Sequence, residues 1–440
     1  MSNQAQSQWM RLDNAAKIYP AARRRNWTAL FRLSATLSHP VEPETLRAAL
    51  ARVIPRFPSF AVRLRSGLFW YYLERNPGVP PIREDGCCPC LPLRPEDNDG
   101  FLLRVLYYDC RIAVEFFHVL SDGTGGLCFL KTLLAEYLTL QYGIDVPRSG
   151  DILDCTVPPQ PEELEDSFLR YADGPSASRR ESAAFRIRGW REPDGFIHLT
   201  CGVIHADVLL ARAREKGVSV TQYLAAVLIL AIDAVQRREV RLDRLQRPVR
   251  ICLPVNLRAF FPSRTLRNFS SFVNAGIDPR LGEHSLDEAL QAVHHYMGSE
   301  VTEKHLRARF TANVRSERNT LLRLMPLFLK NPVMKMAFRA AGDNTSSSTI
   351  TNLGRVQLPV SMRPYVPRME LILGPLSFNP IACSAMSYDN LLYMNITRTI
   401  TDPKVEREFF TRLVKLGIPV RIESNGRPEP PAEEKSCPTV

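Results

Sequence analysis

The sequence predicts an α/β protein in which mixed α+β sheets form two lobes. Strand-like and helix-like segments interleave along both halves of the 440-residue chain, and each half contains segments paired as β-hairpins. A Pro-rich, acidic stretch over residues 147–185 separates the halves and has the composition of a linker or surface loop. Apolar residues make up 45% and charged residues 23% of the chain, which excludes wholesale disorder.

Length and composition also set the expected domain organisation. At about 150 residues per domain, the chain is expected to form two or three compact units. We expect an N-terminal lobe over residues 1–160, a linker or surface loop over 161–190 and a C-terminal lobe over 191–425. Residues 426–440 are rich in Pro and Glu, and we predict a disordered tail there.

In the N-terminal half, alternation of apolar and polar residues predicts strands and helical spacing predicts two helices. The expected strands are residues 28–37, 59–65, 68–74, 101–108 and 111–118, of which the last four form two hairpins. The first helix covers residues 43–54. The second follows the glycine-rich turn at residues 123–126 and ends near Gly143.

The C-terminal half repeats this mixture of elements. Strands are expected near 196–204, up to Pro254, and over 349–356, 368–373, 380–386 and 391–398. Helices are expected over 205–216 and 221–236, and Ser285 with Glu288 forms a capping box that opens another to about residue 299. Helical segments continue to about residue 340, and a last helix begins after Asp402-Pro403 and ends at Gly417.

The charge of the chain narrows the possible binding partners. Lys plus Arg number 57 and Asp plus Glu 46, a formal net charge of +11, and the one dense basic run is Arg23-Arg24-Arg25. No nucleic-acid-binding motif accompanies this charge, so we expect no nucleic acid partner. The spread charge is either a solvated surface or an attraction for an acidic ligand, such as the phosphates of a nucleotide-like cofactor.

The protein is expected to be cytoplasmic. The longest apolar run, residues 223–232, is too short to cross a bilayer, so no transmembrane segment is expected. Residues 1–10 are polar and lack a secretory signal. The ten cysteines should therefore be reduced thiols. Cys87, Cys88 and Cys90 contain a C-x-x-C pattern but lack the second ligand pair that zinc requires, so no metal site is expected.

One stretch carries chemistry. Residues 116–123 (FFHVLSDG) form an apolar strand end that delivers His118, with Asp122 and Gly123 following before a helix. An imidazole titrates near neutral pH and can take a proton from a hydroxyl or amine that attacks a carbonyl. A single His at a strand end is also common as a structural residue, so these residues alone leave both interpretations open.

The pattern His118-x-x-x-Asp122-Gly123 resembles the H-x-x-x-D-G motif of one acyltransferase superfamily. Its members include chloramphenicol acetyltransferase, plant BAHD acyltransferases, peptide-synthetase condensation domains and the bacterial alcohol acetyltransferase and polyketide-associated acyltransferase branch, to which this chain is most similar. Further matching segments occur in the expected order: residues 12–20 (LDNAAKIYP), Arg56-Phe57-Pro58, residues 254–258 (PVNLR), Phe261-Pro262, Arg267-Asn268-Phe269 and residues 351–354 (TNLG). The resemblance covers about residues 9–420, although residues 371–375 (LILGP) replace the D-F-G-W-G motif of plant enzymes.

The resemblance implies two chloramphenicol-acetyltransferase-like lobes with the active-site channel between them. It implies that His118 acts as general base while an acyl group, acetyl by preference, moves from coenzyme A to an alcohol or amine acceptor. No covalent acyl-enzyme and no permanently bound cofactor are implied, since acyl-coenzyme A is a co-substrate. A carrier-protein phosphopantetheine donor, or a non-catalytic binding protein on the same fold, are the alternatives. A monomer is expected because both lobes lie in one chain.

The resemblance also assigns supporting residues. Asp122 pairs with an arginine, for which Arg258 is the candidate, although Asp122 can instead cap the helix that follows it. Gly123 supplies backbone freedom next to the substrate channel. Thr351, and after it Asn352, are candidates to donate to the oxyanion of the tetrahedral intermediate, but a turn that hydrogen-bonds its own backbone explains them equally.

The structural role of one further segment remains open. Residues 321–338 (LLRLMPLFLKNPVMKMAF) are apolar with interspersed Lys and Arg. They are consistent with a pair of core helices, with an apolar wall for a lipid-like substrate, or with contact to a membrane surface.

Overall fold

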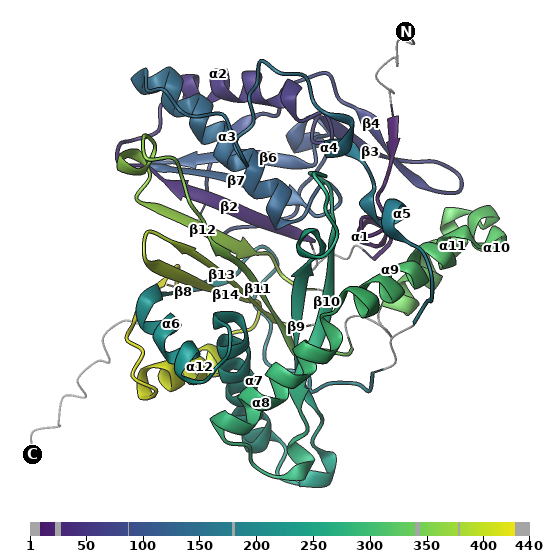
Figure 1. The fold of residues 1–440 in the computed structure, drawn as a ribbon, viewed down its shortest axis with the longest axis vertical. Coiled ribbons are helices and arrows are strands. Elements are labelled where there is room, and N and C mark those ends of the chain that lie inside the picture. Colours follow the sequence, from purple (N-terminus) through teal and green to yellow (C-terminus); the bar gives the residue numbers. More distant parts are fainter. Residues whose placement is uncertain are drawn as a thin grey trace, which may run out of the picture.

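Three β-sheets with helices packed on them make up the structure, a computed structural model (Figure 1). It describes residues 9–22, 28–86, 88–177, 181–338, 344–376 and 379–426. The arginine run at 23–25, Cys87 and the tail from residue 427 lie outside the described residues. The predicted α/β class with mixed sheets is confirmed, because helices and strands alternate along the whole described chain.

The first large sheet carries the strand that leads to His118. Its strand order is β12-β2-β7-β6-β5, and its bounds are Leu30–Thr36 for β2, Ile82–Glu84 for β5, Leu103–Tyr108 for β6, Arg111–Phe117 for β7 and Arg368–Leu373 for β12. A smaller sheet has the order β1-β4-β3, with β1 at Trp9–Arg11, β3 at Val62–Ser66 and β4 at Tyr71–Arg75. Helices α2 (Pro43–Val53) and α3 (Gly123–Tyr142) lie together over the first sheet (Figure 1).

The second large sheet belongs to the C-terminal half and has the order β10-β9-β11-β13-β14-β8-β15. The bounds are His198–His205 for β8, Val249–Asn256 for β9, Ser270–Ile277 for β10, Ser348–Arg355 for β11, Ile381–Tyr388 for β13, Leu391–Arg398 for β14 and Val420–Ser424 for β15. Strand β11 runs parallel to both neighbours, β9 and β13, so the carboxyl ends of these three strands meet at one edge.

The remaining helices surround this sheet or join the two halves. They are α1 (Ile18–Ala22), α4 (Pro161–Leu164), α5 (Ser167–Tyr171), α6 (Ala206–Glu215), α7 (Val220–Glu239), α8 (Leu286–Glu300), α9 (Glu303–Arg318), α10 (Thr320–Leu324), α11 (Leu327–Phe338) and α12 (Lys404–Lys415). Short 3₁₀ turns occur at Ile54–Arg56, Glu96–Asn98, Asp243–Leu245, Leu257–Ala259, Pro279–Leu281 and Arg363–Tyr365. The predicted capping box of Ser285 and Glu288 is present at the start of α8.

Helix α7 is the one helix among the described residues that is long and apolar enough to cross a membrane. Its residues 223–233 are all buried in the C-terminal core, against the sheet and helices α8 and α12. A helix that is apolar all round is expected in such a position, so α7 serves as the central core helix.

The expected division into lobes is crossed by one strand. Strand β12 follows the C-terminal half in sequence but pairs antiparallel with β2, with Leu371 opposite Leu33. Its Met369 and Leu371 are buried in the same core as the first sheet. The boundaries proposed from sequence therefore do not coincide with sheet membership at residues 368–373.

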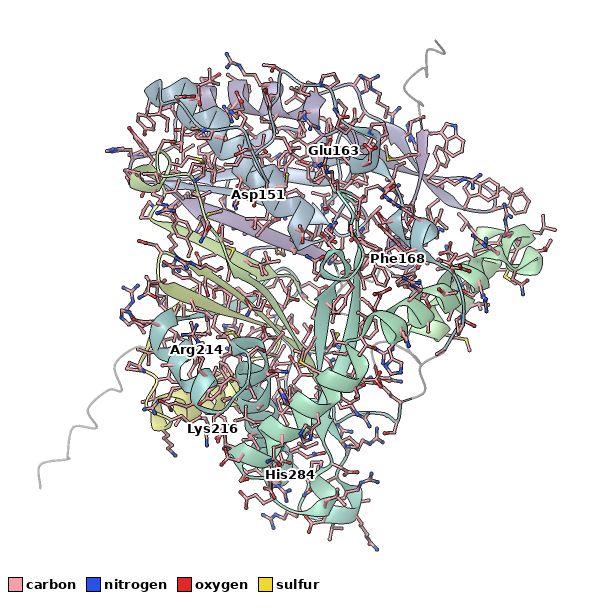
Figure 2. The ribbon with its side chains drawn as sticks, viewed as in Figure 1. Asp151, Glu163, Phe168, Arg214, Lys216 and His284 are labelled. Atoms are coloured by element: carbon pink, nitrogen blue, oxygen red, sulfur yellow. The ribbon has the colours of Figure 1, made fainter. Side chains whose placement is uncertain are left out.

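Part of the expected linker is anchored to both halves. Glu163 accepts hydrogen bonds from both terminal nitrogens of buried Arg56, at 2.5 and 2.7 Å, and so ties α4 to the N-terminal half. Phe168 on α5 packs edge-on against Phe269 and Phe310 of the C-terminal half. Figure 2 labels Glu163 and Phe168 on this connecting segment. It is therefore a docked connection along residues 161–171.

A buried row of charges crosses the first sheet and includes a residue of β7, the strand that leads to His118. Glu115 on β7 lies opposite Arg32 on β2 and Arg104 on β6. Its carboxylate accepts from the Nε atoms of both arginines, at 2.7 and 2.6 Å, and from the backbone N–H of Cys90 at 2.6 Å. Asp85 completes the neutralisation of Arg32. Glu115 is fully buried and is the carboxylate partner of Arg104, whereas Arg32 is balanced by Glu115 and Asp85 together.

We expect Glu115→Ala to lower the free energy of unfolding by about 3–5 kcal/mol, because it leaves Arg104 without its carboxylate partner and Arg32 with Asp85 alone. The measurement is the urea unfolding midpoint, followed by circular dichroism. Glu44→Ala is the matched control: it removes the Glu44–Arg47 pair, in which the side chains are 76% and 54% exposed, and should leave the midpoint nearly unchanged. Equal shifts in both variants would contradict a structural role for the buried row.

Candidate active site

His118 lies directly after β7, where the chain leaves the first sheet. Its backbone N–H donates to the carbonyl of Ala29 at 2.9 Å, which fixes the strand end. The ring of Tyr19 stacks on the imidazole, with centroids 4.8 Å apart and 15° between the planes. Phe31 meets the imidazole edge-on at 5.2 Å. The ring is thus held between two aromatic side chains.

Asn268 determines which imidazole nitrogen carries the proton. Its side-chain NH₂ donates to the backbone carbonyl of His118 at 2.9 Å and to the carboxylate of Asp13 at 3.2 Å. The amide oxygen therefore faces His118 Nδ1, 3.1 Å away, and can only accept a hydrogen bond. In the neutral imidazole, Nδ1 then carries the hydrogen and Nε2 keeps its lone pair.

Burial shifts the pKa values of His118 and Asp13, the two side chains at the ends of these hydrogen bonds. Burial is the largest influence on His118 and lowers the pKa of its imidazole, while Asn268 and the charge of Asp122 oppose the shift. At neutral pH the ring is accordingly the neutral, basic form. Burial also raises the pKa of Asp13 to about 6, against the attraction of Arg267.

Asp122 uses both carboxylate oxygens. One oxygen accepts from the backbone N–H groups of Thr124 and Gly125 at 3.1 and 3.2 Å, and so caps α3. The other accepts from Nη1 of Arg258 at 2.7 Å and from the backbone N–H of Phe269 at 2.8 Å. The two alternatives considered for Asp122, an arginine pair and a helix cap, therefore occur together.

Arg258 extends this contact into the connection between β9 and β10. Its guanidinium donates to the backbone carbonyls of Thr265 and Arg267, at 2.8 and 2.7 Å, besides Asp122. Asn268 and Phe269 follow directly in the same connection. The Arg258–Asp122 pair thus holds this segment of the C-terminal half against the loop that carries His118.

The structure corrects the role expected for Gly123. Its backbone is the first turn of α3 and not a left-handed conformation, so backbone freedom is not what this position requires. A Cβ atom at Gly123 would lie 2.6 Å from Cδ2 of Leu353 on β11. The glycine therefore leaves room for the Leu353 side chain, which packs against the start of α3.

Thr351 and Asn352 lie on β11 just before Leu353, and both are half-buried. The Asn352 side chain accepts from the backbone N–H of Gly354 at 2.8 Å and donates to Thr221 at 3.0 Å. The Asn352 amide is therefore engaged in its own turn, as the alternative interpretation describes. Thr351 is not part of that turn, so it is the better of the two candidates for an oxyanion donor.

Sequence reasoning missed Asn268, Tyr19 and Asp13 as site residues. All three lie in segments whose resemblance to the superfamily was noted, residues 12–20 and 267–269. Their contacts with one another and with His118 depend on packing between parts of the chain that are about 100–250 residues apart. Only the resemblance of those segments pointed to them.

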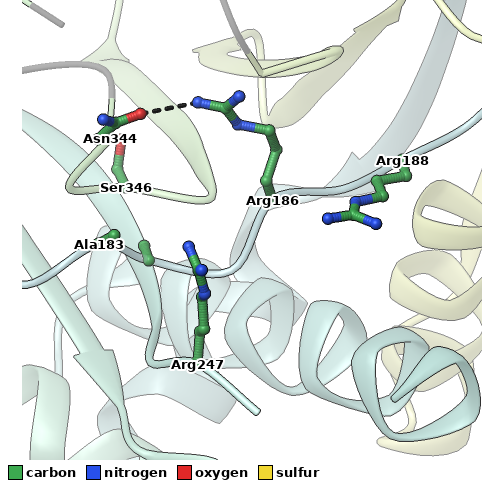
Figure 3. A pocket seen from close by; sticks show the side chains of 7 residues that line it. Ala183, Arg186, Arg188, Arg247, Asn344 and Ser346 are labelled. Carbon is green, nitrogen blue, oxygen red and sulfur yellow. Dashed lines mark hydrogen bonds between the residues drawn. The ribbon is translucent and has the colours of Figure 1, made fainter. Parts of the chain in front are cut away.

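A hollow away from this site is lined by Ala183, Ala184, Arg186, Arg188, Arg247, Asn344 and Ser346. Figure 3 shows Arg186 directed toward Asn344, to which it donates at 2.7 Å. Arg247 precedes β9 and Ser346 precedes β11, whereas the far ends of these strands contact Thr124 and Gly123. The arginine-lined hollow is therefore at the opposite end of the sheet from His118.

The described part of the chain contains no set of side chains arranged to bind a metal ion. No group of three or more His, Cys, Asp or Glu side chains there is arranged to hold an ion. The described cysteines are free thiols.

No protein-family model matches the chain, and no curated protein sequence does. Solved structures do. Polyketide synthase associated protein 5 from Mycobacterium tuberculosis has a TM-score of 0.57 and 14% identity over 88% of this chain and 94% of its own. The trichothecene 15-O-acetyltransferase from Fusarium sporotrichioides has a TM-score of 0.58 and 12% identity over 92% of this chain and 93% of its own.

Condensation domains match equally well. The first condensation domain of the calcium-dependent antibiotic synthetase has a TM-score of 0.58 and 15% identity over 93% of this chain and 96% of its own. The starter condensation domain of rhizomide synthetase, solved with C8-CoA, has a TM-score of 0.57 and 14% identity over 93% of this chain and 95% of its own. The chain therefore has the two-lobed fold shared by condensation domains and their related acyltransferases.

Proposed function

We propose that this chain is an acyltransferase that moves an acyl group, acetyl by preference, from a coenzyme A thioester to an alcohol or amine. The observation that carries the proposal is the Asp13–Asn268–His118 chain of hydrogen bonds, which leaves the Nε2 lone pair of His118 free. A neutral imidazole with a defined tautomer is what a general base requires.

The chemistry follows from that nitrogen. Nε2 takes the proton of the acceptor hydroxyl or amine while the acceptor oxygen or nitrogen attacks the thioester carbonyl. The tetrahedral intermediate carries its negative charge on the former carbonyl oxygen, for which Thr351 is the proposed donor and Asn352 the second candidate. When the C–S bond breaks, the imidazolium returns its proton to the departing thiolate, and no acyl-enzyme forms.

Both halves supply the site, which supports a substrate channel between them. His118 and Tyr19 come from the N-terminal half, whereas Asn268 and Leu353 come from the C-terminal half. We place the donor and acceptor at opposite ends of this channel, and coenzyme A as the co-substrate is supported by the C8-CoA complex of a similar condensation domain. A cytoplasmic monomer, with lobes at 1–160 and 191–425, completes the proposal.

A second candidate uses a phosphopantetheine carrier protein as donor. The likeness to condensation domains of peptide synthetases favours it. The two donors are separated by supplying the same acyl group on coenzyme A and on an isolated carrier protein. A non-catalytic binding protein on this fold is the third possibility, and it predicts ligand binding without turnover.

His118→Ala should reduce acceptor-dependent thiol release by at least about 100-fold, because it removes the general base. The assay follows thiol release from a panel of acyl-coenzyme A and acyl-carrier donors with mixed alcohol and amine acceptors. His294→Ala, on helix α8, is the matched control and should retain full activity. Unchanged release from the His118 variant would sink the assignment, and absence of release with every donor from folded protein would favour the non-catalytic alternative.

The pH profile tests the neutral base. Only the unprotonated imidazole accepts a proton, so kcat/KM should fall on the acid side with an apparent pKa below the ordinary histidine value of about 6.5. Asn268→Ala removes the hydrogen-bond acceptor on Nδ1 that favours the imidazolium and should move this acid limb to lower pH. Asn274→Ala, at a buried asparagine on β10, controls for destabilisation and should leave the limb in place.

Asp122→Asn should lower stability by about 3–5 kcal/mol and thiol release with it, because the asparagine can still cap α3 but leaves Arg258 without its counter-charge. A double-mutant cycle with Arg258→Gln, followed by thermal unfolding, measures the pair directly. Additive effects would contradict direct coupling of the two side chains. Asp287→Asn, in an exposed pair with Lys216, should change little.

A further inference from the structure

One side of the molecule exposes a cluster of large apolar side chains on the β3–β4 hairpin loop and on helices α10 and α11. Phe328 is 70%, Met336 73% and Trp70 53% exposed. We call this cluster the Trp70–Phe328 surface; its members are Leu68, Trp70, Leu324, Phe328, Leu329, Val333 and Met336. The expectation that residues 321–338 form core helices is therefore wrong for the described side chains of this segment.

Hydrogen bonds join the hairpin loop and the helices into one surface. The backbone N–H of Leu327 donates to the carbonyl of Leu68 at 2.9 Å. Lys330 Nζ donates to the carbonyl of Phe69 at 2.6 Å, and the Asn331 amide donates to the hydroxyl of Tyr71 at 2.9 Å. Figure 1 shows the hairpin loop and α10–α11 projecting from the same side of the molecule.

Charge on this side is positive. Residues 320–338 contain no Asp or Glu and three basic residues, Arg323, Lys330 and Lys335. Residues 62–75, which include the hairpin, add three arginines against one acid, Glu74. Arg323 and Lys335 are exposed beside the apolar side chains. A partner that is both apolar and anionic complements this combination.

The short length of helix α11 limits how this surface can contact such a partner. Helix α11 has 12 residues, contains Pro332, and is too short to span a bilayer. Exposed Trp, Phe, Leu and Met side chains next to Lys and Arg are typical of segments that lie in the plane of a membrane interface. An exposed apolar patch of this kind on a folded protein marks an interaction site.

We propose that the Trp70–Phe328 surface docks the protein on anionic phospholipid membranes. Phe328, Met336 and neighbouring leucines enter the boundary between headgroups and acyl chains, with the Trp70 indole at headgroup depth. Arg323 and Lys335 lie against lipid phosphates. Docking involves residues outside the His118 site, so its test is independent of acyl transfer.

The test is flotation of the full chain with vesicles of phosphatidylcholine alone or with equal phosphatidylglycerol. Wild type should float with the anionic vesicles, and high salt should weaken binding. Trp70→Ser and Phe328→Ser should each reduce binding at least about tenfold by removing buried apolar area. Lys335→Gln should reduce it about fivefold.

Trp190→Ser is the matched control, because Trp190 is 86% exposed but lies outside the Trp70–Phe328 surface; it should bind like wild type. Thermal unfolding of each variant checks that the exposed substitutions leave the fold intact. Absence of flotation, or equal flotation of all variants, overturns the proposal. It is also overturned if light scattering shows self-association lost in Phe328→Ser while vesicles bind neither protein.

Discussion

The carboxylate of Asp122 is the contact on which the geometry of the candidate site depends. It caps α3, accepts from the backbone of Phe269 and neutralises Arg258, so one side chain joins the His118 loop to the β9–β10 connection. That connection supplies Asn268, which in turn sets the tautomer of His118. Without the carboxylate, the connection would be held to the His118 loop only by weaker neutral contacts such as those of Asn268 with His118 and of Ser121 with Leu266.

Burial has opposite consequences for the groups around His118. It lowers the pKa of the imidazole and raises that of Asp13, so both changes favour the uncharged forms. The Asn268 amide between them carries no charge and still transmits orientation, because its two ends have different hydrogen-bonding capacity. The site therefore combines an environment that favours the neutral imidazole with a fixed ring orientation, to which the aromatic contacts of Tyr19 and Phe31 contribute.

The local pattern of apolar, polar and capping residues was sufficient to predict most helices and strands, but it missed a few. Strands with clear alternation, such as β7, and helices with a capping signal, such as α8, were predicted close to their bounds. Strand β10 was missed because SSFVNAGI has polar and glycine residues in its interior, and Gly276 is there since a Cβ would meet the carbonyl of Val249 at 2.1 Å. The short edge strand β15 was missed because its alternation covers only the five residues VRIES, two of them apolar.

The site residues that belong to a recognisable sequence motif could be predicted. His118, Asp122 and Arg258 were identified through resemblance, and the structure brings Asp122 and Arg258 together. The position of Asn268 against His118 could not be derived, since it requires two segments 150 residues apart to be packed at hydrogen-bond distance. Likewise, the composition of residues 321–338 left a core position and an exposed position both open, because exposure is decided by which neighbours the fold provides.

The pairing of β12 with β2 has a consequence for biosynthesis. The first sheet remains open at β2 until residue 373 has been made, because β12 completes that edge. During translation, a nascent chain ending near residue 190 exposes an unpaired strand edge, the feature through which partly folded chains associate. The first sheet is thus completed only after most of the C-terminal half has been synthesised, so the N-terminal half cannot reach its final structure before then.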